Sequence, residues 1–182
     1  PMHDTHYNPA FWGVKSTEAS LTDKQKIDSA MMRARDYAIH QYNSVVAYMK
    51  SLGVIKPVHI GETGWASFDN ELYGNNGSKA VDEYKAALYY QLMRDWTNKE
   101  GITCFYFEAF DEQWKNSANP LHSENHFGLI DLESRAKYAA WEMVDQNVFK
   151  GLTRNGKPIV KTYNGDEKQM WQEVKVPTNN VQ

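Results

Sequence analysis

The feature that most constrains this chain is the alternation of strand-like and helix-like segments over its first 150 residues. Short apolar runs occur at about 5–12, 55–62 and 102–110. Each is followed by a longer stretch with apolar residues at helical spacing, at about 22–52, 78–100 and 134–150. Strands that alternate with helices pair in parallel, because each helix carries the chain back across the sheet. The sequence therefore predicts an α/β fold with parallel strands and crossover helices.

Local signals set the expected ends of these helices. Thr22 and Gln25 have the form of a capping box at the start of the first helix, and Gly53 stands where its C-terminal cap belongs. Ser78 is the expected N-cap of the second helix, which should end before Gly101. Three apolar stripes should face inward: Ile27, Met31, Ala34, Ala38, Val45, Met49 and Leu52; Val81, Tyr84, Leu88, Leu92 and Trp96; Tyr138, Trp141, Val144 and Val148.

The alternation fades after Gly151, which divides the chain into residues 1–152 and a C-terminal extension, 153–182. Within the extension, Asn155-Gly156 and Asn164-Gly165 are turn signals, and the first of these predicts a small hairpin. Residues 176–182 look like a frayed tail.

Charge and composition narrow the classes of function. A net charge of −3 argues against nucleic acid or an anionic membrane as the main partner. No apolar run approaches the roughly 18 residues of a membrane span. The single cysteine, Cys104, rules out an intramolecular disulfide. No charged and apolar leader follows Pro1, so no signal peptide is expected in this chain.

Acidic and aromatic residues gather at the predicted strand ends, where parallel α/β folds place their functional groups. The three ends carry His6, Tyr7, Asn8, Phe11 and Trp12; Glu62 and Trp65; and Glu108, Asp111, Glu112, Trp114 and Lys115. Carboxylates handle proton transfer and attack at an anomeric carbon, and aromatic faces hold sugar rings, so this combination is typical of a glycosidase. Each group also has a simpler interpretation, as a solvated loop acid, a charge at a helix start or a core aromatic.

Three ordered blocks of sequence resemble glycoside hydrolase family 17. "GETGWAS", at 61–67, resembles the nucleophile motif of that family. "FEAFDEQWK" followed by "ENHFGLID" looks like its last barrel strand and the following loop, especially in the bacterial and fungal β-1,3-glucanase branch. "HYNPAFW" is similar to its sixth-strand segment. The resemblance implies a (β/α)8 TIM barrel with retaining chemistry, of which this chain is the C-terminal part with about three β/α units visible.

The resemblance also implies roles for individual residues. Glu62 would be the nucleophile, supported by Glu112, Lys115 and Glu124, and Lys115 would help to keep Glu62 ionised. Glu108 would face the same site. The candidate sugar platforms are Tyr7, Phe11, Trp12, Trp65 and Trp114. Double displacement on β-1,3-glucan by these groups requires neither a metal nor an organic cofactor.

Two departures from the family pattern matter. Ala66 stands where the family has a proline, which loosens the loop. More seriously, no Asn-Glu pair of the kind that supplies the family's general acid precedes the nucleophile motif, and Asn70-Glu71 lies after it. We therefore expect an incomplete barrel that lacks the acid/base glutamate, since a complete barrel takes about 250 residues. Its open edge should pair with a second copy or with the rest of the barrel.

Other functions stay open at this point. His122, Glu124 and His126 alternate, so on a strand they would share one face as a metal site, with His3 and His6 as further ligands. A non-catalytic carbohydrate-binding or interaction module would keep the aromatics without complete catalytic machinery. A β-1,3-glucan transglycosylase would share the chemistry and differ in its acceptor. A polymer substrate outside the cytoplasm implies a secreted or periplasmic protein.

Overall fold

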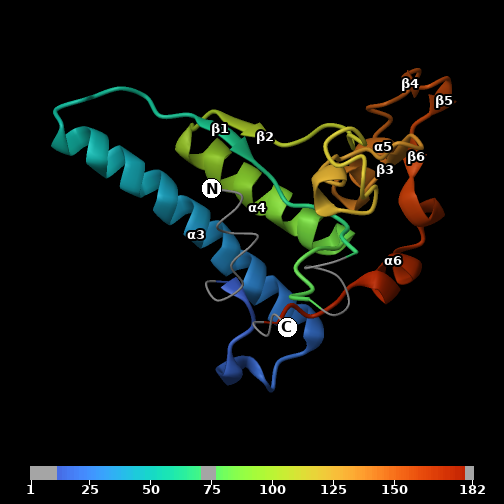
Figure 1. Cartoon of the computed structure of the whole chain (residues 1–182), viewed down its shortest axis with the longest axis horizontal. Coiled ribbons are helices and arrows are strands. Elements are labelled where there is room, and N and C mark those ends of the chain that lie inside the picture. The colour runs from blue at the N-terminus through green and yellow to red at the C-terminus, as the bar shows by residue number, and fades with distance from the viewer. Residues whose placement is uncertain (1–11, 71–76, 179–182) are drawn as a thin grey trace.

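The computed structural model of the protein describes residues 12–70 and 77–178 (Figure 1). Its helices are α3 (Asp23–Ser51), α4 (Glu83–Glu100), α5 (Trp141–Asp145) and α6 (Glu167–Glu173). Its strands are β1 (Ile60–Thr63), β2 (Cys104–Tyr106), β3 (Arg135–Ala136), β4 (Thr153–Arg154), β5 (Lys157–Pro158) and β6 (Val160–Lys161). The predicted platforms Tyr7 and Phe11, with His3, His6 and Glu71, lie outside the described residues.

Helix α3 begins and ends where the sequence predicts. The Thr22 side chain accepts a hydrogen bond from the Gln25 amide, and Gln25 reaches back to the Thr22 amide, which completes the capping box. Gly53, just beyond the helix, has a φ of 71°, a left-handed conformation that glycine adopts without steric cost. Residues close to each end of the helix therefore set where it begins and ends, as predicted.

A parallel βαβ unit follows α3 and confirms the predicted strand pairing. Strands β1 and β2 pair in parallel, joined by α4 (Figure 1). The N-cap of α4 is Asp82 rather than the predicted Ser78, because the Asp82 carboxylate accepts the Lys85 amide hydrogen bond at 2.9 Å. Gly101 ends the helix with a φ of 66°.

The third helix predicted at 134–150 is largely absent. Within it, Ser134 has a φ of 69° and Asn147 a φ of 57°, so the chain leaves the helical region near both ends. Residues 135–136 form β3 instead, paired in parallel with β6. Only a 3-10 turn (Tyr138–Ala140) and the short α5 keep helical geometry. A strand from the distant extension thus overrides the local preference for helix.

The C-terminal extension packs against the preceding residues. Strands β4 and β5 form an antiparallel hairpin across Asn155 and Gly156. In α6, the Met170 side chain is 0% exposed in the core. Further along, Pro177 is buried and the Thr178 amide donates to the Ser78 carbonyl at 2.9 Å. Residues up to 178 are therefore not frayed, contrary to the expectation for the start of the tail.

The core lies where α3, α4 and β1 meet, and aromatic rings fill much of it. The Trp12 and Trp65 rings meet edge to face with centroids 5.0 Å apart, and Tyr89 lies 5.0 Å from Trp65 on the other side. The Trp65 indole donates to the Ala80 carbonyl at 2.9 Å, which satisfies its only polar atom.

Apart from the buried core, the described part of the chain has apolar side chains that remain exposed. Val45 and Leu52, predicted to face inward on α3, are exposed, and Phe105 on β2 is 64% exposed. The prediction that Val45 and Leu52 face inward is therefore wrong. In the same half of α3, Tyr42 does pack, with its ring 5.5 Å from that of Trp96.

Candidate active site

Backbone hydrogen bonds bring the ends of three motif segments together. The Phe107 amide donates to the Thr63 carbonyl at 2.7 Å, which places the end of β2 beside the end of β1. Glu108 then exchanges backbone hydrogen bonds with Phe127 and Leu129 at 3.2 and 2.9 Å. The "GETGWAS", "FEAFDEQWK" and "ENHFGLID" segments therefore lie side by side.

Gly128 is required for this close approach. A Cβ added at Gly128 would lie 2.1 Å from the Asp111 nitrogen, far inside van der Waals contact. The Gly128 amide also donates to the Asp111 carboxylate at 2.8 Å. The glycine of the third motif thus allows the 126–130 segment to lie against the segment that follows β2.

Glu62, the predicted nucleophile, lies on β1 and is exposed. No ion pair between described residues includes it. In particular, Lys115, expected to keep Glu62 ionised, pairs instead with Glu108 at 3.4 Å and with Glu112 at 3.5 Å. Lys115 therefore does not pair with Glu62 as expected. It pairs with two glutamates on the neighbouring segment.

The Glu108, Glu112 and Lys115 side chains form that cluster. Glu108 is mostly buried, and its Oε1 atom has no hydrogen-bond partner among the described residues. Burial raises the pKa of Glu108 to about 7, because loss of water penalises the carboxylate; Lys115 opposes this shift and Glu112 adds to it. Glu108 is therefore about half protonated near neutral pH.

Aromatic rings flank the cluster. The Lys115 ammonium lies 3.5 Å from the centroid of the Phe107 ring and 5.9 Å from that of Trp114, both within cation–π range. Trp114 is 72% exposed, so a face of its indole is available to a ligand. Its role as a sugar platform stays a prediction.

Two other predicted platforms do not fit that role. Trp12 is 0% exposed and Trp65 is 1% exposed, and both rings are enclosed by the core. Neither ring has a free face on which a sugar could stack, so their assignment as platforms is corrected. Their large apolar faces pack in the core, where α3, α4 and the loop after β1 meet.

The possible metal site at 122–126 is not formed. Residues 123–125 adopt a 3-10 helix rather than the strand that would have placed His122, Glu124 and His126 on one face. His126 instead lies 3.5 Å from the Asp111 carboxylate, with a ring nitrogen 3.0 Å from the Pro120 carbonyl. The described residues contain no group of three His, Cys, Asp or Glu side chains that could hold a metal ion.

Lys137, which no sequence motif marks as a site residue, forms a buried ion pair with Asp111 at 2.6 Å. The Lys137 ammonium also donates to the His126 carbonyl at 3.1 Å. The pair fixes the loop after β2 against the 126–130 segment. Asp111 was recognised as a strand-end acid, but no local signal marks Lys137, because it lies within the stretch predicted as a helix.

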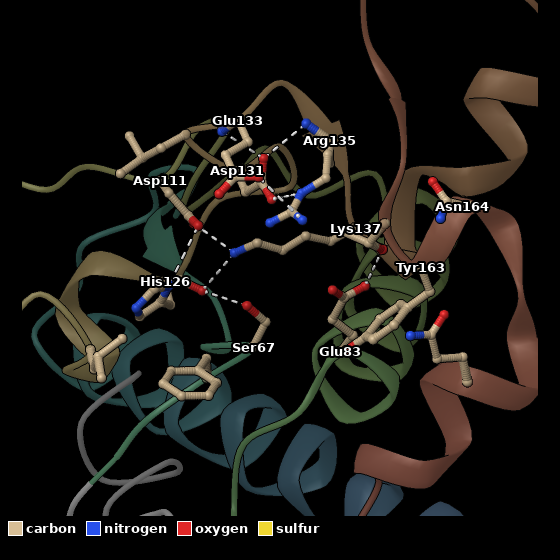
Figure 2. Close-up of a pocket in the computed structure, with 15 residues that line it drawn as sticks. Ser67, Glu83, Asp111, His126, Asp131, Glu133, Arg135, Lys137, Tyr163 and Asn164 are labelled. Atoms are coloured by element: carbon tan, nitrogen blue, oxygen red, sulfur yellow. Dashed lines mark hydrogen bonds and ion pairs between the residues drawn. The ribbon is translucent and has the colours of Figure 1, made fainter.

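A pocket of about 590 Å³ opens beside this ion pair (Figure 2). Figure 2 shows the Lys137 side chain extended between Glu83 and Asp111, with Ser67 and Tyr163 at the sides. The pocket is not lined by any of the charged residues predicted for the site, which are Glu62, Glu108, Glu112, Lys115 and Glu124. The pocket is therefore separate from the cluster around Lys115.

Parallel strand ends that carry carboxyl groups, a lysine and an exposed tryptophan define a site of the glycoside hydrolase class. Within that class, the chain belongs to glycosyl hydrolases family 17, whose sequence model matches residues 25–140. The matched range includes the GETGWAS segment, the Lys115 cluster and the buried Asp111–Lys137 pair.

Individual relatives agree with this assignment. The crystal structure of an endo-laminarinase from Formosa Hel1_33_131 is 58% identical and superposes with a TM-score of 0.93, covering 97% of this chain and 45% of that chain. A glucan 1,3-beta-glucosidase from Arthroderma benhamiae is 34% identical over 139 residues, 72% of this chain and 39% of the relative. The chain thus spans less than half the length of these two relatives.

Among residues 12–70 and 77–178, no helix combines the length and the apolar character that crossing a bilayer would require.

Proposed function

We propose that the protein is a retaining glycoside hydrolase that cleaves β-1,3-glucan by double displacement, with Glu62 as the nucleophile. The observation that supports this proposal is that backbone hydrogen bonds hold the three motif segments side by side, with exposed Glu62 on β1 and the Glu108–Lys115 cluster on the segment after β2. The 58% identity to an endo-laminarinase supports the choice of a β-1,3-glucan as substrate.

The proposed reaction proceeds in two steps. A Glu62 carboxylate oxygen attacks the anomeric carbon, the bond to the leaving sugar oxygen breaks, and a general acid protonates that oxygen. Water then attacks the same carbon, the former acid takes a proton from the water, and Glu62 is released. If a sugar hydroxyl attacks in place of water in the second step, the glycosyl group is transferred from Glu62 to that sugar, which is a transglycosylation.

We propose that the general acid is a carboxyl group of the larger fold outside residues 1–182. No Asn-Glu pair precedes the nucleophile motif, and the solved relative is more than twice as long as its matched part. In this proposal the chain is the C-terminal part of a (β/α)8 barrel. The exposed apolar residues on α3 and β2 are then surfaces that the rest of the barrel, or a second copy, covers.

The other members of the cluster take supporting roles in the proposal. Lys115 holds Glu108 and Glu112 in place, Glu124 lines the same cleft, and Trp114 provides an exposed ring for a glucose unit. Double displacement of this kind uses carboxyl groups alone and needs no cofactor. A polymeric glucan substrate favours a secreted or periplasmic location.

The test is release of reducing ends from laminarin by the protein with its complete barrel, unaltered and as Glu62→Gln. Glu62→Gln should lower the rate by at least a thousand-fold, because it removes the attacking carboxylate while keeping the size of the side chain. Glu100→Gln, an equally exposed change at the far end of α4, is the matched control and should leave the rate unchanged.

A mechanism-based fluorosugar label gives an independent readout. We expect mass spectrometry to find the sugar on the peptide that contains Glu62. Labelling of another residue, or full activity of Glu62→Gln, would refute the assignment. Laminarin binding without turnover in either form would favour the carbohydrate-binding module instead.

A further inference from the structure

We propose that the pocket between Lys137 and Tyr163 is a second sugar-binding site, which holds a glucose unit of β-glucan away from the Glu62 cleft. The choice of glucan as ligand depends on the proposed function, whereas the existence of a site for a polyhydroxyl ligand does not. At about 590 Å³ the pocket is within the roughly 300–1,000 Å³ of small-molecule sites.

The pocket and the proposed cleft use different residues of the loop after β2. Asp111 lines the pocket and pairs with Lys137, whereas the adjacent Glu112 pairs with Lys115 on the cleft side. His126 likewise lines the pocket, while Glu124 does not. Two sites can therefore be occupied independently, although one loop supports both.

The floor of the pocket is held in place by buried interactions. Asp111 accepts hydrogen bonds from both Lys137 and the Gly128 amide, at 2.6 and 2.8 Å. The Ser67 hydroxyl donates to the His126 carbonyl at 3.0 Å. A ligand would therefore meet a preformed surface, which reduces the entropy lost on binding.

Polar groups around the pocket retain hydrogen-bonding capacity. Glu83 accepts hydrogen bonds from the Tyr138 amide and the Thr162 hydroxyl, both at 2.8 Å and both on Oε2, which leaves Oε1 as an acceptor. No hydrogen bond between described residues engages the Tyr163 hydroxyl or the Asn164 amide. Donors and acceptors are therefore both present, as the hydroxyl groups of a sugar require.

Apolar walls complement these polar groups. Phe68 is 45% exposed, and its ring packs edge-on against His126 with centroids 5.2 Å apart. Leu121 and Leu132 line the rim and are also exposed. These surfaces suit the C–H face of a pyranose ring, which a purely ionic ligand would not use.

Charged ligands fit the pocket less well. Its two cationic side chains are already paired, Lys137 with Asp111 and Arg135 with Asp131, each at 2.6 Å. An anion would compete with these carboxylates. Asp111, Asp131 and Glu133 are paired with these two cations, and the described residues contain no group of three side chains that could hold a metal ion. A neutral polyhydroxyl ligand is the class that remains.

Backbone geometry supports a role in binding. Tyr163, Asn164 and Gly165 are three consecutive residues with φ values of 51°, 53° and 77°. This conformation is unfavourable for the two non-glycine residues and is often found where side chains are held for a ligand. Here it presents the Tyr163 and Asn164 side chains at the pocket (Figure 2).

The test is affinity electrophoresis of the chain in gels that contain laminarin. Gln169 on α6 also lines the pocket. In a Trp114→Ala background, which weakens binding at the cleft, Tyr163→Phe and Gln169→Ala should each reduce the affinity about five-fold, the effect of losing one hydrogen bond. Gln172→Ala on the same helix and Tyr48→Phe on α3 are matched controls, and neither should change the affinity. Circular dichroism checks that every variant is folded.

Hydrolysis distinguishes this site from the cleft. In the protein with its complete barrel and with Trp114 intact, Tyr163→Phe and Gln169→Ala should leave turnover of laminaritriose unchanged, because neither residue belongs to the Glu62–Lys115 site. Unchanged affinity for laminarin in both pocket variants would overturn the proposal, as would an equal loss of laminaritriose turnover. Absence of turnover in every form would contradict the proposed function but would leave the binding result interpretable.

Discussion

Glu108 illustrates how burial sets the charge of a side chain in this protein. Burial raises its pKa from 4.5 to about 7, although Lys115 lies 3.4 Å away. A raised folded-state pKa means that, between these two values, the folded chain binds more protons than the unfolded chain. Stability from this group is therefore greatest at low pH and decreases as the pH rises towards 7.

We predict that Glu108→Gln removes this part of the pH dependence. The unaltered chain should become less stable between pH 4.5 and about 7 through ionisation of Glu108, and the variant should show a flatter profile. Urea denaturation midpoints across this range measure the effect. Glu100→Gln, an exposed acid on α4, should keep the original profile. If the denaturation midpoint of Glu108→Gln fell with pH as steeply as that of the unaltered chain, the assigned pKa would be contradicted.

The contact between the loop after β2 and the 126–130 segment depends on one glycine. A Cβ at Gly128 would overlap the backbone of Asp111, which cannot move without breaking its pairing with Lys137. This contact joins two motif segments, so its geometry decides how the ends of β1 and β2 are supported.

Gly128→Ala should accordingly destabilise the chain by about 1–3 kcal/mol, the usual cost of overpacking. Thermal or urea unfolding followed by circular dichroism provides the measurement. Gly61→Ala on β1 is the matched control, because a Cβ there has nothing within 4 Å and the φ is not left-handed. Equal stability of the two variants would show that the Asp111 contact is not tight.

The molecule as a whole folds its C-terminal extension onto the α3–α4 core. Met170 belongs to the same buried cluster as Trp12 and Trp65, and the Trp171 ring lies 4.4 Å from that of Tyr84. β3 and β6 join the two parts through backbone pairing. These contacts indicate one cooperative unit rather than a domain with an appended segment.

Met170→Ala should therefore destabilise the whole chain by about 2–5 kcal/mol, as expected for a large-to-small change in a core. Tryptophan fluorescence and circular dichroism should report one shared transition at a lower temperature. Lys168→Ala, an exposed change on the same helix, should have little effect. If only a minor, separate transition shifts, residues 153–178 unfold independently of the core.

Part of the site was predictable and part was not. The motif segments predicted that Glu62, Glu108 and Lys115 belong to neighbouring strand ends, because strand order follows chain order in a parallel βαβ unit. The partner of Lys115 was not predictable. Ion pairs depend on side-chain positions across different segments, and here Glu108 and Glu112 lie closer than the sequence argument assumed.

The sequence alone determined the features that depend on neighbouring residues. The Thr22–Gln25 capping box, the glycines that end α3 and α4, and the parallel order of β1 and β2 all follow from local chemistry and alternation. Only the tertiary structure decided which aromatics are buried and where residues 134–150 leave the helix. Those outcomes depend on contacts between segments far apart in the chain, such as Arg135 with Val160, whose energies exceed local preferences.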